Sequence, residues 1–254
     1  PPGDDEPVLV ADDDEDALAD MRAAVARALP GIEVVTARDG EKAWLAARSR
    51  PPRLAILDLM MPGATGTELV ARFRSDERLR SVPILLMTNK VVSTEDLRAI
   101  EGYSRIALHN KGVWTEEDAA AGIARLAGGD PPLPAATSAV VKRCIAYMNR
   151  YFATAVTRWK LAEAVNVSED YLSRIFRREL GITPWEYLSR LRVKRAKEFL
   201  AAGSESVALV GERVGFPDQA YFSRVFRKVA GMSPQAYRDT AGKKPRLPHQ
   251  DQRT

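Results

Sequence analysis

The first half of the chain alternates short apolar runs with segments in which apolar residues recur every three or four positions. The apolar runs predict buried β-strands at 7–11, 32–36, 54–57, 82–87 and 106–108. The periodic segments between them predict helices at 17–29, 40–47, 66–73, 95–100 and 116–126. In the second of these helices we expect Trp44 and Leu45 to form the buried face. Strands that alternate with helices predict an α/β fold with a doubly wound, five-stranded parallel sheet.

The second half contains one sequence pattern twice. Tyr171–Tyr187 recurs as Tyr221–Tyr237, at an offset of 50 residues. In each copy a short helix meets a tight turn and a second helix follows. We expect the short helices at 160–165 and 207–214, and the turns at Asn166-Val167 and Gly215-Phe216. The second helices are expected to start from Ser168 and Pro217. This arrangement predicts an all-α double helix-turn-helix domain, with a long helix at 184–200 that holds the two units at a fixed distance.

The second helix of each copy has one apolar face and one basic face. Leu172, Ile175 and Phe176 share the apolar face, as do Phe222, Val225 and Phe226 in the second copy. A Ser-Arg pair falls off that face near the start of each helix, at Ser173-Arg174 and Ser223-Arg224. A solvated surface is the ordinary explanation for such arginines, but the repetition in register favours contact with DNA bases. Arg177, Arg227 and Lys228 lie further along and better suit phosphates.

The charge balance separates the two halves. The net charge of +4 is the sum of −7 over residues 1–130 and +11 over residues 131–254. The basic half is therefore a candidate for nucleic-acid binding. A proline-rich stretch at 129–137 would be the linker, and the segment 241–254 looks like a disordered basic tail.

The composition also indicates the cellular compartment in which we expect the protein. One cysteine, Cys144, excludes an intrachain disulfide and favours a reducing, cytoplasmic compartment. No apolar run approaches the roughly 20 residues of a membrane span, so we expect no membrane partner. The chain starts with an acidic segment rather than with Met, which suggests a piece of a longer protein.

Polar residues follow four of the five predicted strands. Asp12 and Asp13 follow the first, Asp58 the third, Thr88 the fourth and Lys111 the fifth. Because ligands bind at the carboxyl ends of parallel strands, we expect these residues along one edge of the sheet. Crowded carboxylates favour Mg²⁺, and a carboxylate nucleophile, a metal, a hydroxyl and a lysine together predict phosphoryl transfer to Asp58. Taken alone, Asp58 could equally be a residue that caps the following turn.

These residues resemble the receiver domains of two-component response regulators. The match rests on Asp12-Asp13, the run Asp58–Gly66, Thr88 and Lys111, and covers roughly residues 6–128. The resemblance implies a flavodoxin-like fold, phosphorylation of Asp58 by a histidine kinase, and Asp12, Asp13 and Asp58 as metal ligands. Three positions depart from the family pattern, which usually has a small residue at Asn89, an aromatic residue at Leu108 and proline at Gly112. We therefore expect phosphorylation to be retained and the signal to leave the domain in an atypical way.

An enzymatic interpretation is also open at the first strand. Asp12-x-Asp14 loosely resembles haloacid-dehalogenase-type phosphatases, whose motif normally continues with Thr or Val. This chain has Asp16 instead, and Asp58 would have no role in that chemistry. We therefore do not expect an enzyme. The two histidines, His109 and His249, have no metal-ligand partner at useful spacing and no expected catalytic role.

The second half resembles the DNA-binding domain of the AraC/XylS family of bacterial transcription activators, over about residues 138–240. The second unit carries the most diagnostic residues, which are Val214-Gly-Phe216, Gln219, Tyr221–Phe226, Gly231, Ser233-Pro234 and Tyr237-Arg238. The resemblance implies base contacts from Asp170, Ser173 and Arg174 in the first unit and from Gln219, Ala220, Ser223 and Arg224 in the second. It also implies DNA and RNA polymerase as partners.

Together these features predict a transcription regulator in which phosphorylation of Asp58 controls DNA binding, with self-association as the expected intermediary. The predicted parts are a receiver at 6–128, a linker at 129–137, a DNA-binding domain at 138–240 and a tail at 241–254. A DNA-binding protein with an inert receiver, a phosphorelay sink, and the regulator end of a hybrid sensor kinase are the alternatives.

Overall fold

The computed structural model describes residues 6–89, 93–128, 135–203 and 205–241. The chain forms two compact units. One holds Pro1–Arg150 and Val156–Tyr187, and the other holds Tyr151–Ala155 and Leu188–Thr254. The first helix-turn-helix therefore belongs to the same compact unit as the α/β part of the chain.

The first unit is built on a five-stranded parallel sheet with the order β2-β1-β3-β4-β5. The strands are β1 Val8–Ala11, β2 Val34–Ala37, β3 Leu54–Asp58, β4 Ile84–Thr88 and β5 Ile106–Asn110. Every residue of β1, β3, β4 and β5 is buried, as expected of strands covered by helices on both faces, whereas β2 is partly exposed. The prediction of a doubly wound parallel sheet is confirmed.

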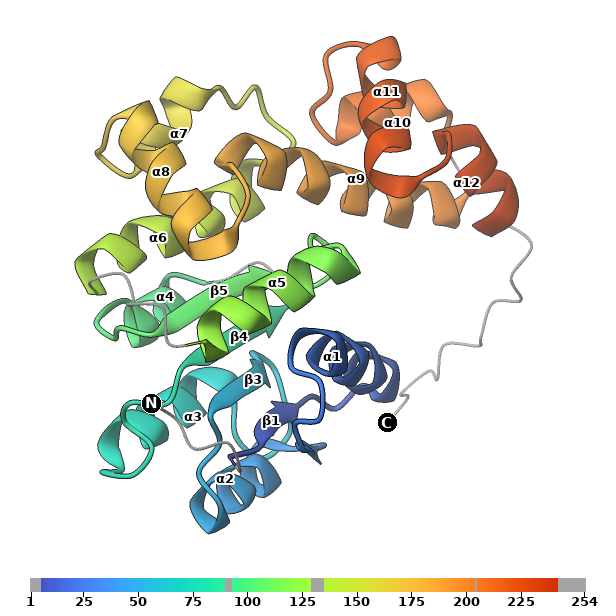
Figure 1. The fold of residues 1–254 in the computed structure, drawn as a ribbon. Helices are drawn as coiled ribbons and strands as arrows, with labels where there is room; N and C mark the ends of the chain where they lie inside the picture. Colours follow the sequence, from blue (N-terminus) through green and yellow to red (C-terminus); the bar gives the residue numbers. More distant parts are fainter. Residues whose placement is uncertain (1–5, 90–92, 129–134, 204, 242–254) are drawn as a thin grey trace, which may run out of the picture. The chain divides into compact units, whose positions relative to one another are not determined.

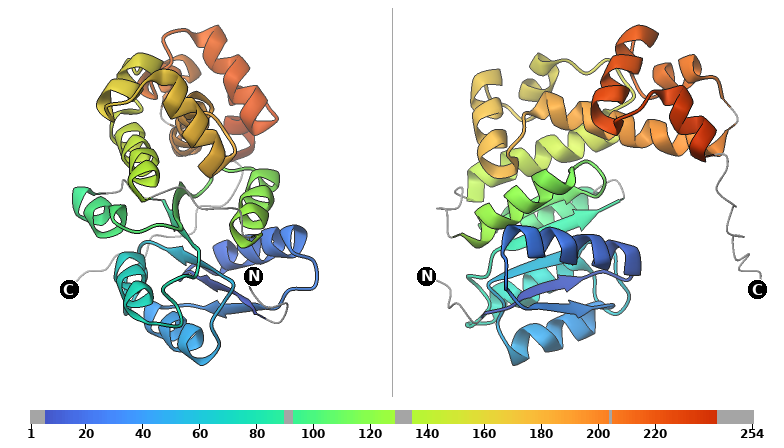
Figure 2. Two further views of the ribbon diagram at one scale, coloured as in Figure 1. Left: turned by 60° about the vertical axis from the view of Figure 1, so that its left-hand side comes forward. Right: turned by 45° about the vertical axis from the view of Figure 1, so that its right-hand side comes forward.

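Five helices cover the two faces of the sheet (Figures 1 and 2). They are α1 Glu15–Ala28, α2 Gly40–Ser49, α3 Gly66–Ser75, α4 Thr94–Glu101 and α5 Glu116–Ala127. Helix α1 packs against α5, while α3 packs against α2 and α4 on the other face. Each helix starts at a polar side chain that accepts backbone N–H groups of its first turn, and these caps are Asp14, Asp39, Thr65, Ser93 and Thr115.

The predicted buried face of α2 is wrong. Ala43 and Ala47 are its buried apolar side chains, and Leu45 is 65% exposed. Trp44 is half-buried, tilted against Phe73 at a ring-centroid distance of 6.1 Å. The guanidinium groups of Arg48 and Arg72 lie 5.8 and 6.0 Å from its ring. Small alanines let α2 lie close to the sheet, so the large residues are left at its margin.

The helical part repeats its local structure as well as its sequence. It consists of α6 Ala135–Tyr151, α7 Arg158–Ala164, α8 Glu169–Leu180, α9 Pro184–Ala202, α10 Val207–Arg213, α11 Gln219–Ala230 and α12 Pro234–Ala241. The turn between the paired helices is left-handed in both copies, with φ of 56° at Asn166 and 88° at Gly215. Asparagine and glycine are the residues that adopt this conformation most readily. Both second helices end at a left-handed glycine, Gly181 or Gly231.

The starts of α11 and α6 differ from the sequence prediction. Helix α8 begins after Ser168 as expected, but α11 begins at Gln219 after the cap Asp218, which leaves Pro217 outside the helix. Asp218 forms the better cap because its carboxylate accepts from the backbone N–H of Tyr221 at 2.6 Å. Helix α6 includes Ala135 and the two residues after it, which we had expected in the linker. The rest of that linker, at 129–134, and the tail at 242–254 lie outside the described residues.

Within the described ranges, no helix has both the length and the apolar character that crossing a bilayer requires.

Candidate functional site

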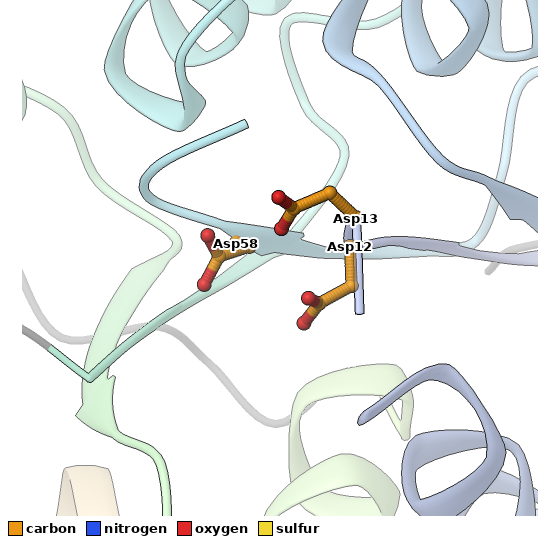
Figure 3. Close-up of side chains that lie close together, drawn as sticks. All are labelled: Asp12, Asp13 and Asp58. Carbon is orange, nitrogen blue, oxygen red and sulfur yellow. The ribbon is translucent and has the colours of Figure 1, made fainter. Parts of the chain in front are cut away.

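Three carboxylates meet at the carboxyl edge of the sheet (Figure 3). Asp12 and Asp13 follow β1, and Asp58 is the last residue of the neighbouring strand β3. Each offers an oxygen, and these three atoms lie within 4.8 Å of one another. Asp12 and Asp58 are buried, whereas Asp13 is exposed. The edge thus collects the predicted metal ligands into one oxygen-rich cluster that opens to solvent at Asp13.

Lys111 joins the two buried carboxylates. Its Nζ lies 2.6 Å from Asp12 Oδ2 and 2.6 Å from Asp58 Oδ1. Burial disfavours the charged ammonium, but the hydrogen bonds and attraction from both carboxylates outweigh it and raise the pKa of Lys111. Burial also disfavours the charged form of Asp12 and raises the pKa of this carboxyl, although Lys111 acts in the opposite direction. Lys111 therefore stays protonated and partly balances the charge of the cluster.

Backbone hydrogen bonds fix the remaining oxygens. The Met60 N–H donates to Asp58 Oδ2 at 2.8 Å, so Asp58 both caps the following turn and pairs with Lys111. The Asp14 N–H donates to Asp12 Oδ1 at 3.2 Å. The Asp14 carboxylate caps α1 by accepting hydrogen bonds from the N–H groups of Asp16 and Ala17. This structural role argues against Asp14 as the general acid of a phosphatase.

Thr88 and Lys111 are brought to the same edge by the pairing of β4 with β5. Thr88 is buried at the end of β4, where its partner in register is Asn110. The Lys111 N–H donates to the Thr88 carbonyl at 2.8 Å. Gly112 follows with φ of 75°, which proline, fixed near −65°, could not adopt. Leu108 is fully buried inside β5 rather than lying at the surface.

The donor set suits a hard divalent cation. Mg²⁺ prefers oxygen ligands and usually takes only one or two carboxylates, keeping several waters. The cluster offers two buried carboxylates and the exposed Asp13, which is an arrangement that could hold this ion. A cavity of about 240 Å³ lies beside the cluster, lined by residues that include Asp12, Arg27, Lys111 and Trp114. It leaves room for a small group to approach Lys111 and Asp12.

The basic face of the first helix-turn-helix is accessible. Asp170, Arg174 and Arg177 are exposed on α8 and Ser173 is half-buried. The Arg174 guanidinium lies 5.4 Å from the Tyr171 ring, which holds it near the start of the helix. A groove of about 280 Å³ collects Asp170, Ser173 and Arg177 with two residues that sequence analysis missed, Arg158 and Trp185. Arg158 begins α7 and Trp185 lies in α9, so neither is on the second helix whose basic face the sequence pattern marks.

The second helix-turn-helix presents the matching face on α11. Gln219, Ala220, Arg224, Arg227 and Lys228 are exposed, and Ser223 is half-buried. The Arg224 guanidinium lies 5.9 Å from the Tyr221 ring, as Arg174 lies over Tyr171 in the first copy. Phe216, Phe222 and Phe226 are buried and pack with one another, as core residues do. The predicted base-contacting residues therefore share one face in each copy.

Comparison with protein families accounts for both parts of the chain. A family model described as the response regulator receiver domain matches residues 8–103. A second, described as a helix-turn-helix domain, matches residues 161–240. The chain joins a response regulator receiver domain to an AraC-type helix-turn-helix domain.

Curated relatives are similar to part of this receiver and AraC-type chain. It is 31% identical over 112 residues to the HTH-type transcriptional regulator YisR of Bacillus subtilis, over 44% of this chain and 39% of that protein. It is 42% identical over 78 residues to the arabinose operon regulatory protein of Escherichia coli, over 31% of this chain and 27% of that protein. The chain thus spans less than half the length of either relative.

Solved structures similar to the chain include the C-terminal domain of a response regulator. The C-terminal domain of AraT, a response regulator from Geobacillus stearothermophilus, is 35% identical, with 44% of this chain and 94% of that chain covered and a TM-score of 0.40.

Proposed function

We propose that this protein is a transcription regulator whose affinity for DNA is controlled by phosphoryl transfer from a histidine kinase to Asp58. The observation that carries the proposal is the position of Lys111, whose Nζ bridges Asp12 and Asp58 at 2.6 Å each. The same chain carries two exposed basic helices suited to DNA. One chain thus carries both the residues proposed for phosphoryl transfer and the residues proposed for DNA contact.

In the proposed reaction, a carboxylate oxygen of Asp58 attacks the phosphorus of a phosphohistidine. An O–P bond forms, the P–N bond breaks, and the imidazole leaves with the electron pair and takes up a proton from water. Lys111 stabilises the negative charge on the phosphoryl oxygens, and the Met60 N–H keeps the carboxylate oriented. Thr88, at the end of β4, is proposed to hydrogen-bond one phosphoryl oxygen.

Asp12, Asp13 and Asp58 are the residues that would hold Mg²⁺, which supplies charge neutralisation at the phosphoryl oxygens when bound. Without a cation, three carboxylates beside one lysine leave an excess of negative charge that would repel a phosphoryl donor. We therefore expect acceptance of the phosphoryl group to require a divalent cation.

On DNA, Asp170, Ser173 and Arg174 are proposed to contact bases from α8, and Gln219, Ser223 and Arg224 from α11. Arg174 and Arg224 suit bidentate contacts with guanine. Arg177, Arg227 and Lys228 would contact phosphates and fix the orientation of each helix. Because the two sets repeat at an offset of 50 residues, we expect a target with two half-sites.

Mass spectrometry after incubation with phosphoramidate and Mg²⁺ tests the acceptor. We expect about 80 Da to be added to the protein, on Asp58, which is the mass of one phosphoryl group. EDTA should abolish the adduct, as should Asp58→Asn. Asp39→Asn, which changes a helix cap on the same sheet edge, is the matched control and should leave the adduct intact. Absence of an adduct on the unaltered protein would mean that the receiver is inert.

A further inference from the structure

The end of β5 carries a contact to the DNA-binding part directly beside the candidate phosphoryl site. Asn110 precedes Lys111, and its Nδ2 donates to Asn149 Oδ1 of α6 at 2.9 Å. Both side chains are buried, with exposures of 0% and 1%. Asn149 Nδ2 in turn donates to the Ile145 carbonyl of α6 at 2.9 Å. A shift of the backbone at Lys111 would therefore act on α6 through this buried hydrogen bond.

A second contact runs from β5 to the first recognition helix through aromatic rings. His109 meets Tyr187 edge-on at a centroid distance of 5.6 Å. Tyr187, at the start of α9, meets Phe176 of α8 in the same way at 5.7 Å. All three side chains are fully buried. Because close-packed interiors transmit displacement rather than absorb it, these rings link β5 to the helix that carries Arg174.

A polar cluster around the buried Ser138 and Lys142 of α6 holds the C-terminal end of α8. Ser138 Oγ of α6 donates to Glu179 Oε1 at 3.0 Å, and Lys142 Nζ donates to Ser138 Oγ at 3.0 Å and to the Tyr103 carbonyl at 3.4 Å. Burial lowers the pKa of Lys142 and raises that of Glu179. Arg125 of α5 lies against Gly181, the C-cap of α8. Sealed polar groups tolerate few alternative arrangements, so they fix how α8 is held.

From these contacts we propose that the Asn110–Asn149 hydrogen bond carries the signal from β5 to α6 and α8. The proposal rests on phosphorylation of Asp58. A phosphoryl group there competes for Lys111 Nζ, which now bridges Asp12 and Asp58, and so draws on the backbone next to Asn110. Neither an aromatic residue at position 108 nor proline at 112 is needed for this route. It also means that α6 of the same chain covers this part of β5, so that a second copy would have to bind elsewhere.

The test compares two substitutions on α6. Asn149→Ala removes the acceptor of the proposed relay. Arg143→Ala is the matched control, because Arg143 Nη1 reaches Glu101 Oε1 of α4 at 3.8 Å from the exposed side of the same helix. Each protein is treated with Mg²⁺ and beryllofluoride, a phosphoryl mimic, and binding of the mimic is measured by isothermal titration calorimetry. Amide hydrogen exchange and the dissociation constant for a selected DNA site are then measured with and without it.

In the unaltered protein and in Arg143→Ala we expect the mimic to change amide exchange at least threefold in both β5 and α8, and to change DNA affinity by about 5–150-fold, the usual range for coupled sites. In Asn149→Ala the mimic should still bind and alter β5, while the effects on α8 and on DNA affinity fall to less than a third of their original size. Asn110→Ala removes the donor and should give the same result, and the double variant should add nothing further.

Full coupling in Asn149→Ala or Asn110→Ala would overturn the relay, as would an unaltered protein in which the mimic binds without any effect on α6 and α8. An unaltered protein that does not bind the mimic at all would instead contradict the proposed phosphoryl chemistry, and the relay with it. If Asn149→Ala proves too unstable to fold, Asn110→Ala decides the matter alone.

Discussion

The two helix-turn-helix repeats have the same local structure and different surroundings. In both, a tyrosine meets a phenylalanine of the second helix edge-on, at 5.7 Å for Tyr187 and Phe176 and at 5.8 Å for Tyr237 and Phe226. In the first repeat His109 packs on the tyrosine and the ring is fully buried. In the second, the ring is half-buried and Lys197 Nζ lies 5.5 Å from its centroid.

The difference continues at a position where the repeated sequence diverges. Glu179 of α8 corresponds to Val229 of α11. Glu179 accepts from Ser138 beside the buried Lys142, whereas Val229 packs on an apolar cluster. Glu179, which differs between the repeats, thus belongs to a polar cluster that reaches the receiver through Lys142 and the Tyr103 carbonyl, whereas Val229 serves the core of the second repeat.

Truncation of the two tyrosines should give the largest difference in stability between the two repeats. Tyr187→Ala should destabilise the protein by about 3–5 kcal/mol, because it empties a fully buried aromatic site. Tyr237→Ala should lower stability by only about 1–2 kcal/mol, because that side chain is already partly exposed to water. Urea unfolding of the two variants measures both values, and equal losses would contradict the difference in burial.

Exchange of the diverging residue should have the next largest effect. Glu179→Val should cost about 3 kcal/mol, because it removes the carboxylate that offsets the charge of the buried Lys142 most strongly. The double variant Lys142→Met with Glu179→Val should recover to within about 1 kcal/mol of the original stability, since an apolar replacement removes the unpaired charge. A double variant no more stable than Glu179→Val would show that the pair does not interact. Val229→Glu, at a half-buried position, is the control and should cost about 1 kcal/mol.

These contrasts mark how far the sequence could predict the structure. The strands were predictable because a strand buried on both faces needs a continuous apolar run, and the acidic cluster followed from the strand ends. The repeated helix-turn-helix was evident from its offset. Leu45 was misplaced because helical periodicity does not say which neighbour a helix packs on. The contact between Asn110 and Asn149 joins residues 39 apart, and no local pattern encodes such a pairing.

On DNA, the two repeats should behave alike at their arginines. Arg174→Ala and Arg224→Ala should each lose about 1–3 kcal/mol of binding free energy at one base position, because each removes a bidentate contact with guanine. Binding titrations against single-base variants of a selected site would locate the affected position in each half-site. A loss that is the same on specific and random DNA would contradict base contact by that arginine.

Phosphate contacts should give the smallest effect. Lys228→Ala should weaken binding to all DNA sequences by a similar factor and lower the slope of log affinity against log salt by about 1. The salt titration that measures this slope can be run on random DNA. An unchanged slope would mean that Lys228 does not contact DNA phosphates. A loss of affinity confined to one sequence would mean that Lys228 contacts a base.

The most direct test of the central claim is the ratio of dissociation constants for a selected DNA site without and with a phosphoryl group on Asp58. If phosphorylation controls DNA binding, the two constants differ by about 5–150-fold in the unaltered protein and are equal in Asp58→Asn. Equal affinities in the two states of the unaltered protein, with the adduct on Asp58 verified by mass, would contradict it.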